Sequence, residues 1–416
     1  MIPRLNIAFP IKRQWQYWFG KEYEPLKGEY LLNHARTGIV MALKASVPEG
    51  SRVGVVAYNC HTVANAVVNA GCKPVFVDVT EELKIDIASV PANLDAIVVT
   101  NLFGIRNDIE AIRKRCPKAI IIVDNAHGYG LPAEGDFTVY SINQGKFPAL
   151  GCGGILCVNI KENKNKENTA CAEENDSKSK TNNPAPQDTA YAASSVIANH
   201  LDDKQAYLQS NCQSLSDNCN KLPSSDYSEK NDSTFESTKN TKNNVAAIDE
   251  MYAALPSYRF MGQMKLFCSM LVKAIAYSRC MYWLTMKMKK SSNPKVHEKV
   301  VMMKMAPGVR RMYQAALPEI PKMINLQRQN AAKIGDWTLD IGHLIVGENA
   351  FMAVVRTEKP EELKREFASK GVETETHFKH CIEWAKQFGY IEETCPNAEK
   401  LINHLLMIPT YSEVRN

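Results

Sequence analysis

Two short segments of the sequence hold residue types that can do chemistry on a bound ligand. The first segment, residues 124–128, reads Asp-Asn-Ala-His-Gly and ends a run of apolar residues. The second, residues 140–146, reads Tyr-Ser-Ile-Asn-Gln-Gly-Lys. An aspartate that closes an apolar run is costly to bury unless it meets a cation or hydrogen-bond donors. A lysine in a glycine-bounded turn is a candidate amine nucleophile, so Asp124 and Lys146 are the first candidate catalytic residues.

An aspartate and a lysine are also the pair that pyridoxal phosphate requires. The lysine holds the aldehyde of that cofactor as a Schiff base, and the aspartate pairs with the pyridinium nitrogen so that the ring withdraws electrons. Asp124 and Lys146 could equally form a buried ion pair with a purely structural role. The two residues alone leave both interpretations open.

Several other kinds of site are not expected from the sequence. It contains no GxGxxG and no GxxxxGK[ST] pattern, so the usual phosphate cradles of dinucleotide-binding and P-loop proteins are missing. None of the 12 cysteines forms a CxxC pair, and we expect no metal site. The N-terminus has no sustained apolar run, so we predict a cytoplasmic protein with reduced thiols and no disulfide framework.

The elements that position the two segments belong to an alternating pattern. Nearly continuous apolar runs rich in β-branched residues predict strands that are buried on both faces. These strands fall at 52–58, 73–79, 95–104, 119–128 and 137–143, and helices are expected near 36–46, 61–71 and 108–115. The alternation predicts βαβ units and a mostly parallel sheet. Because ligands of such sheets bind beyond the carboxyl ends of strands, Asp124 and Lys146 should reach one crevice.

A change of composition marks an insertion at 161–250. This range has 14 Asn and 12 Ser and no Gly, Met, Trp or Arg, and we predict that it is disordered. Order returns after it, with a core-packed helix at 264–289, a hairpin at 343–357 and helices at 360–371 and near 379–388. The predicted division is an N-terminal arm (1–33), a large domain (34–160), the insertion (161–250), the remainder of the large domain (251–320) and a small α+β domain (321–416).

With these residues in place, the sequence resembles the DegT/DnrJ/EryC1/StrS aminotransferases, which use pyridoxal phosphate to aminate keto-sugars. The resemblance runs from about residue 28 to 160 and resumes more weakly from about 305 to 411. The family's Asp-x-x-(Gln or His) motif matches Asp124 and His127. Its serine five residues before the cofactor lysine matches Ser141 and Lys146, and its Gly-Gly pair matches residues 153–154. The resemblance implies an α/β protein of fold type I, with a large domain and a small α+β C-terminal domain.

The resemblance also implies a role for each site residue. Lys146 is similar to the Schiff-base lysine that later moves the proton, and Asp124 to the partner of the pyridinium nitrogen. His127 matches the position that contacts the ring or its 3′-oxygen, and Ser141 matches a phosphate ligand. Arg36 and Thr37 stand where the family binds phosphate at a helix start. Cys60 and His61 cover the ring-stacking region, although neither is an aromatic platform of the usual kind.

The function implied is an aminotransferase that moves an amino group from glutamate to a nucleotide-linked keto-sugar, for a polysaccharide or a glycosylated metabolite. The resemblance further implies a homodimer. A sugar dehydratase of the same family is disfavoured, since those enzymes replace the lysine with histidine. A binding or regulatory protein without turnover remains an alternative.

The charge of the chain is unevenly distributed. The insertion carries 10 Lys and 15 acidic residues, which is a net charge of −5. The rest of the chain, its body, therefore has a net charge of about +10, although the whole chain has +5. A basic body suits a phosphate cofactor and a pyrophosphate-bearing substrate. It does not indicate nucleic-acid binding, and no membrane span is expected.

Overall fold

The computed structural model describes residues 18–159, 233–276, 281, 296–338 and 342–411. All of them belong to one unit of the chain, composed of Met1–Asn159 and Ser233–Asn416. Most of the predicted insertion, from residue 161 to 232, lies outside the described residues, as does most of the predicted arm.

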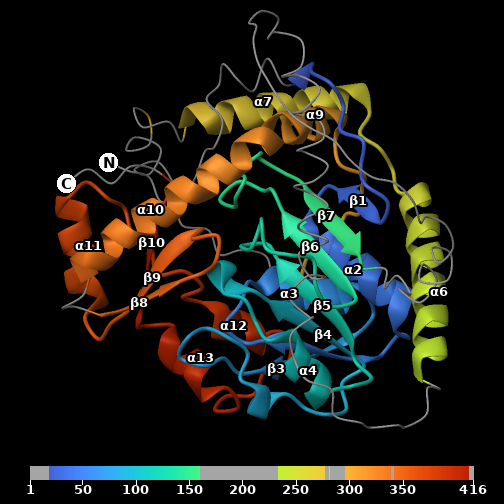
Figure 1. Ribbon diagram of the computed structural model, residues 1–416, viewed down its shortest axis with the longest axis horizontal. Coiled ribbons are helices and arrows are strands. Elements are labelled where there is room, and N and C mark those ends of the chain that lie inside the picture. Colours follow the sequence, from blue (N-terminus) through green and yellow to red (C-terminus); the bar gives the residue numbers. More distant parts are fainter. Residues whose placement is uncertain (1–17, 160–232, 277–280, 282–295, 339–341, 412–416) are drawn as a thin grey trace, which may run out of the picture. The chain divides into compact units, whose positions relative to one another are not determined.

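A seven-stranded sheet forms the centre of this unit (Figure 1). Its order is β1-β7-β6-β5-β4-β2-β3, and β3, β2, β4, β5 and β6 run parallel to one another, as the alternating pattern predicts. Only β7 runs antiparallel to its neighbours β6 and β1. The strands are β1 (Glu29–Leu32), β2 (Arg52–Val56), β3 (Lys73–Val77), β4 (Ala96–Thr100), β5 (Ile120–Asn125), β6 (Phe137–Ser141) and β7 (Gly154–Val158).

Both faces of the sheet are buried, which explains the unbroken apolar runs in the sequence. In β4, Ile97 and Val99 enter one core, and Ala96 and Val98 enter the other. Helices α2 (Ala35–Ser46), α3 (His61–Asn69) and α6 (Ser233–Ala254) pack in the second core. Helices α4 (Ile109–Arg115), α7 (Phe260–Ala276) and α9 (Pro307–Ala316) contribute to the first. The sheet therefore lies between two layers of helices, and a site can form at the ends of its strands.

A second, three-stranded antiparallel sheet lies in the C-terminal part of the chain and has the order β10-β9-β8. The expected hairpin is present as β8 (His343–Val346) and β9 (Met352–Arg356), joined by β10 (Leu405–Pro409). Helices α10 (Ile320–Thr338), α11 (Pro360–Ser369), α12 (Cys381–Lys386) and α13 (Pro396–Leu401) accompany it. Val355, Leu363, Phe367 and Ile408 build a separate small core here.

Three predicted boundaries differ from the structure. The last residues of the predicted arm form β1 within the main sheet, because Leu31 and Leu32 are fully buried there. Residues 233–250 of the predicted disordered range are helical in α6, whose residue Ile248 is buried against the large-domain core. The helix predicted over 264–289 begins at Phe260, and residues beyond Ala276, apart from 281, lie outside the described part. None of the helices in the described part of the chain has the length and apolar character needed to span a membrane.

Candidate functional site

Lys146 lies in the connection between β6 and β7, in the turn that the sequence predicts. The Lys146 backbone N–H donates to the carbonyl of Asn143 at 3.0 Å, which closes the turn. Gly145 has a φ of +79°, a left-handed conformation that glycine adopts without steric cost. The side chain is half-buried. Burial lowers the pKa of the Lys146 amine, and the nearby Cys60, Asp124 and Glu375 oppose that effect.

His127 makes the closest polar contact of this lysine. Its Nε2 lies 2.5 Å from the Lys146 Nζ, and its Nδ1 accepts a hydrogen bond of 3.2 Å from the backbone N–H of Phe103. The imidazole is buried and stacks against Phe103 and Phe351, with ring centroids 5.2 and 5.0 Å apart. Burial is the main cause that lowers the pKa of His127 well below its usual range, and the neighbouring basic groups Lys146 and His377 act in the same direction. The imidazolium form of His127 is therefore disfavoured, and the two stacked rings restrict the orientation of the imidazole.

Asp124 occupies the carboxyl end of β5 and is buried. Its Oδ1 accepts a hydrogen bond of 3.0 Å from the backbone N–H of Ala126. Burial raises the pKa of the Asp124 carboxyl, while Ala126, the Lys146 charge and the Thr100 hydroxyl act in the opposite direction. No ion pair of Asp124 is present among the described residues. A buried carboxylate so placed can pair with a protonated ring nitrogen.

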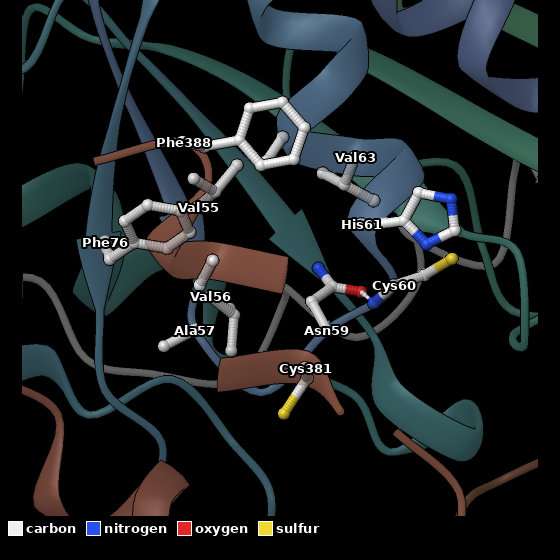
Figure 2. Close-up of a pocket in the computed structure, with 12 residues that line it drawn as sticks. Val55, Val56, Ala57, Asn59, Cys60, His61, Val63, Phe76, Cys381 and Phe388 are labelled. Atoms are coloured by element: carbon white, nitrogen blue, oxygen red, sulfur yellow. Dashed lines mark hydrogen bonds between the residues drawn. The ribbon is translucent and has the colours of Figure 1, made fainter. Parts of the chain in front are cut away.

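Cys60 precedes α3 and lies within the electrostatic reach of Lys146. Figure 2 shows its sulfur beside the imidazole of His61. Burial alone would raise the pKa of the Cys60 thiol, but His61, Lys146 and Thr62 lower it to about 7. Cys60 and His61 also line a small pocket between α3 and α12, whose walls include Val55, Phe76, Cys381 and Phe388. Lys146 and Asp124 do not line that mainly apolar pocket, so we place the candidate site at the strand ends instead.

Ser141 and the start of α2 meet where β7 begins. Ser141 pairs with Gly154 in the β6–β7 register. A Cβ atom on Gly154 would lie 2.2 Å from the backbone of Ala35, so only glycine allows this approach. Ser141 is 4% exposed, and its hydroxyl makes no hydrogen bond within the described part of the chain. This hydroxyl beside a helix start is suited to an anion.

Arg36 and Thr37, the other two predicted phosphate ligands, are placed differently. Arg36 is half-buried at the first turn of α2 and has no ion-pair partner among the described residues. The hydroxyl of Thr37 donates to Asn33 Oδ1 at 2.8 Å, and its backbone N–H donates to the carbonyl of His34 at 3.1 Å. Both donors of Thr37 are thus already used, which leaves Arg36 as the available cation.

The residues that the small sheet brings to this site were not predicted from the sequence. Asn349 is buried and donates through Nδ2 to the carbonyls of His127 (2.8 Å) and Tyr129 (3.1 Å). Its Oδ1 accepts from the backbone N–H of Phe351 at 3.1 Å. Asn349 thus fixes the loop that places Phe351 against His127. A turn asparagine between β8 and β9 is too common a feature to indicate such a contact.

The chain was compared with models of protein families and with curated proteins. The model of the DegT/DnrJ/EryC1/StrS aminotransferase family matches residues 32–184 of the chain. The resemblance to this family is confirmed. The matched segment contains both chemistry-bearing segments of the sequence. The comparison with curated proteins found no match.

Solved structures of aminotransferases and of a dehydratase share the fold of the chain. The aminotransferase TlmJ from Streptoalloteichus hindustanus has a TM-score of 0.59 and 13% identity, with 99% of this chain and 94% of that one covered. The sugar aminotransferase CalS13 from Micromonospora echinospora has a TM-score of 0.56 and 13% identity, with 99% of this chain and 95% of that one covered. An E. coli GDP-4-keto-6-deoxy-D-mannose-3-dehydratase with bound hydrated PLP has a TM-score of 0.50 and 16% identity, with 98% of this chain and 89% of that one covered. The predicted fold type I is confirmed, and at these identities the likeness concerns the fold alone.

Within the part of the chain that the structure describes, no group of three or more His, Cys, Asp or Glu side chains is arranged to hold a metal ion. The groups that lie near the Lys146 amine are the imidazole of His127, the buried carboxylate of Asp124 and the thiol of Cys60, and the Ser141 hydroxyl lies at the end of β6. This set matches an organic cofactor with a cationic ring nitrogen and a phosphate better than it matches a metal.

Proposed function

We propose that the chain is a pyridoxal-phosphate-dependent aminotransferase that moves an amino group from an amino acid, glutamate first among them, to a nucleotide-linked keto-sugar. One observation carries the proposal: the Lys146 amine lies 2.5 Å from His127, and the buried Asp124 acts on the same amine electrostatically. The Lys146 amine hydrogen-bonds to His127 and forms no ion pair with Asp124 among the described residues, which argues against an Asp–Lys pair of purely structural role. The structural neighbours that are sugar aminotransferases support the acceptor class.

Each residue has a place in holding the cofactor. Lys146 would bind it covalently, and Asp124 would pair with the ring nitrogen. Ser141 and Arg36 would bind the phosphate, since both have unused hydrogen-bonding capacity beside the start of α2. His127 would face the ring oxygen, and Cys60 would lie against the ring. A thiol gives less contact area than an aromatic ring.

The bound cofactor would supply an electron-withdrawing ring. The residues of the chain would do the rest. Lys146, once released, would take the proton from the amino-acid carbon and deliver it at the other end of the reacting system, as a general base and then a general acid. Asp124 would keep the ring nitrogen protonated, because a buried carboxylate stabilises a neighbouring cation strongly. The aromatic rings of Phe103 and Phe351 would exclude water from this side of the site.

The proposal extends to the setting of the reaction. A homodimer in the cytoplasm, acting in the synthesis of a polysaccharide or a glycosylated metabolite, would fit an enzyme of this kind. The basic character of the body outside the insertion favours an acceptor that carries a pyrophosphate.

A half-reaction tests the proposal. Purified protein saturated with pyridoxal phosphate is mixed with glutamate, and we expect loss of the visible absorbance band together with release of 2-oxoglutarate. Keto-sugar nucleotides are then added, and the acceptor should restore the band. Binding of the cofactor without reaction with any amino acid would favour a binding protein, and consumption of a keto-sugar without net amine transfer would favour a dehydratase. Either result would overturn the proposal, and the Lys146→Ala variant is the control.

A further inference from the structure

The hydrogen bonds of His127 fix the position of its proton. A backbone N–H can only donate, so the bond from Phe103 requires a lone pair on His127 Nδ1. A neutral imidazole carries one N–H, which must then sit on Nε2. The alternative tautomer would point an Nδ1–H at the N–H of Phe103, and two donors cannot share a hydrogen bond.

The tautomer of His127 also determines the protonation state of Lys146. Nε2 lies 2.5 Å from the Lys146 Nζ, and with Nε2 as the donor the amine must accept. An ammonium group has three donors and no acceptor, whereas a neutral amine has a lone pair. We infer that the Phe103 backbone N–H locks His127 as the Nε2–H tautomer, and that His127 thereby holds Lys146 as a neutral amine. Phe103 and His127 are in this respect positioning residues.

The surroundings of the pair favour this state. The His127 imidazole is buried and the Lys146 side chain is half-buried, and burial is the largest influence that lowers the pKa of each group. The groups that favour the ammonium form are Cys60, Asp124 and Glu375, and His377 lies near the imidazole with its ring centroid 5.8 Å away. Within the described part of the chain, the hydrogen bond to the Lys146 Nζ is made by His127. Stacking against Phe103 and Phe351 prevents the imidazole from turning to exchange its two nitrogens.

The consequence for catalysis rests on the proposed function. A neutral amine is the nucleophilic form of lysine, so the lock would prepare Lys146 to capture an aldehyde near neutral pH. The tautomer itself depends only on contacts within the chain and can be measured without any cofactor.

Nitrogen NMR of the cofactor-free protein tests the tautomer. Protein labelled with ¹⁵N-histidine is studied by long-range ¹H–¹⁵N correlation at pH 7, and His127→Gln identifies the His127 signals. We expect an unprotonated, pyridine-like Nδ1 and a protonated, pyrrole-like Nε2. His377→Gln, a matched change beside the same ring, should leave this pattern intact. A protonated Nδ1, or two protonated nitrogens, would overturn the inference whatever the outcome of the glutamate assay.

Competitive labelling tests the state of the amine. Acetic anhydride reacts with neutral amines, and peptide mass spectrometry reports the extent of labelling at Lys146 across a pH series. Glutamine can accept a hydrogen bond from an ammonium group, so His127→Gln should remove the lock. At pH values where most of the Lys146 amine is protonated, we expect about five times less labelling of Lys146 in this variant than in the natural protein. A factor of about five corresponds to the loss of one ordinary hydrogen bond that favours the neutral amine. Equal labelling in both proteins would show that the imidazole does not hold the amine neutral.

Discussion

Replacement of Asn349 by alanine should both destabilise the protein and disturb the site. Asn349 is 2% exposed and makes three hydrogen bonds, two to the carbonyls of His127 and Tyr129 and one from the N–H of Phe351. Each such bond contributes about 1 kcal/mol net, and its backbone partners would be left unpaired in a buried place, so we expect a loss of about 3 kcal/mol in the free energy of unfolding. Urea titration of the cofactor-free protein measures it.

A neighbouring change separates the role of Asn349 from general loosening of the loop. The Thr410 hydroxyl donates to the carbonyls of Ala350 and Phe351 from the other side of the same loop, at 2.6 and 3.1 Å. Thr410→Val should therefore cost about 1–2 kcal/mol and leave His127 in place. A loss of less than about 1 kcal/mol for Asn349→Ala would show that these three hydrogen bonds do not hold the loop, since each buried bond alone contributes about that much.

Three further predictions concern the strand ends. Gly154→Ala should destabilise the protein by about 3 kcal/mol or more, because the new Cβ would lie 2.2 Å from the backbone of Ala35. The control is Gly262→Ala in α7, where the nearest atom lies 3.7 Å from the new Cβ. This change should be neutral or stabilising in the same urea titration. Burial lowers the pKa of His34 to about 4, so the unfolded chain takes up a proton before the folded chain does as pH falls below 6.5. The free energy of unfolding should therefore drop between pH 7 and 5 by about 2 kcal/mol more in the natural protein than in His34→Gln. An equal drop in the two proteins would contradict this prediction. Asp124→Asn should weaken pyridoxal phosphate binding roughly 10- to 100-fold in a fluorescence titration, since one charge-assisted hydrogen bond is lost, and unchanged affinity would argue against the ring-nitrogen contact.

The strands and the chemistry-bearing segments could be predicted because their signals are local. A strand buried on both faces needs a continuous apolar run, and β4 and β5 have one. Asp124 stood out because a carboxylate that closes such a run is costly to bury, and Lys146 stood out because it lies in a glycine-bounded turn. The spacing from Ser141 to Lys146 and from Asp124 to His127 then carried the family resemblance.

The contacts made by the C-terminal part of the chain could not be predicted in the same way. Asn349 and His127 are more than 200 residues apart in the sequence, and their hydrogen bond follows from how two sheets pack. Thr37 was a reasonable phosphate ligand by position, but its hydroxyl is used by Asn33 one turn away. The tautomer of His127 depends on the backbone N–H of Phe103, and a backbone group leaves no trace in residue types.

The most direct test of the central claim is to locate the lysine that binds the cofactor. The protein is incubated with pyridoxal phosphate, reduced with borohydride, digested and analysed by peptide mass spectrometry. The account predicts one pyridoxyl group per chain, on Lys146, and none in Lys146→Ala. A label spread over exposed lysines, or a label that persists in that variant, would contradict it.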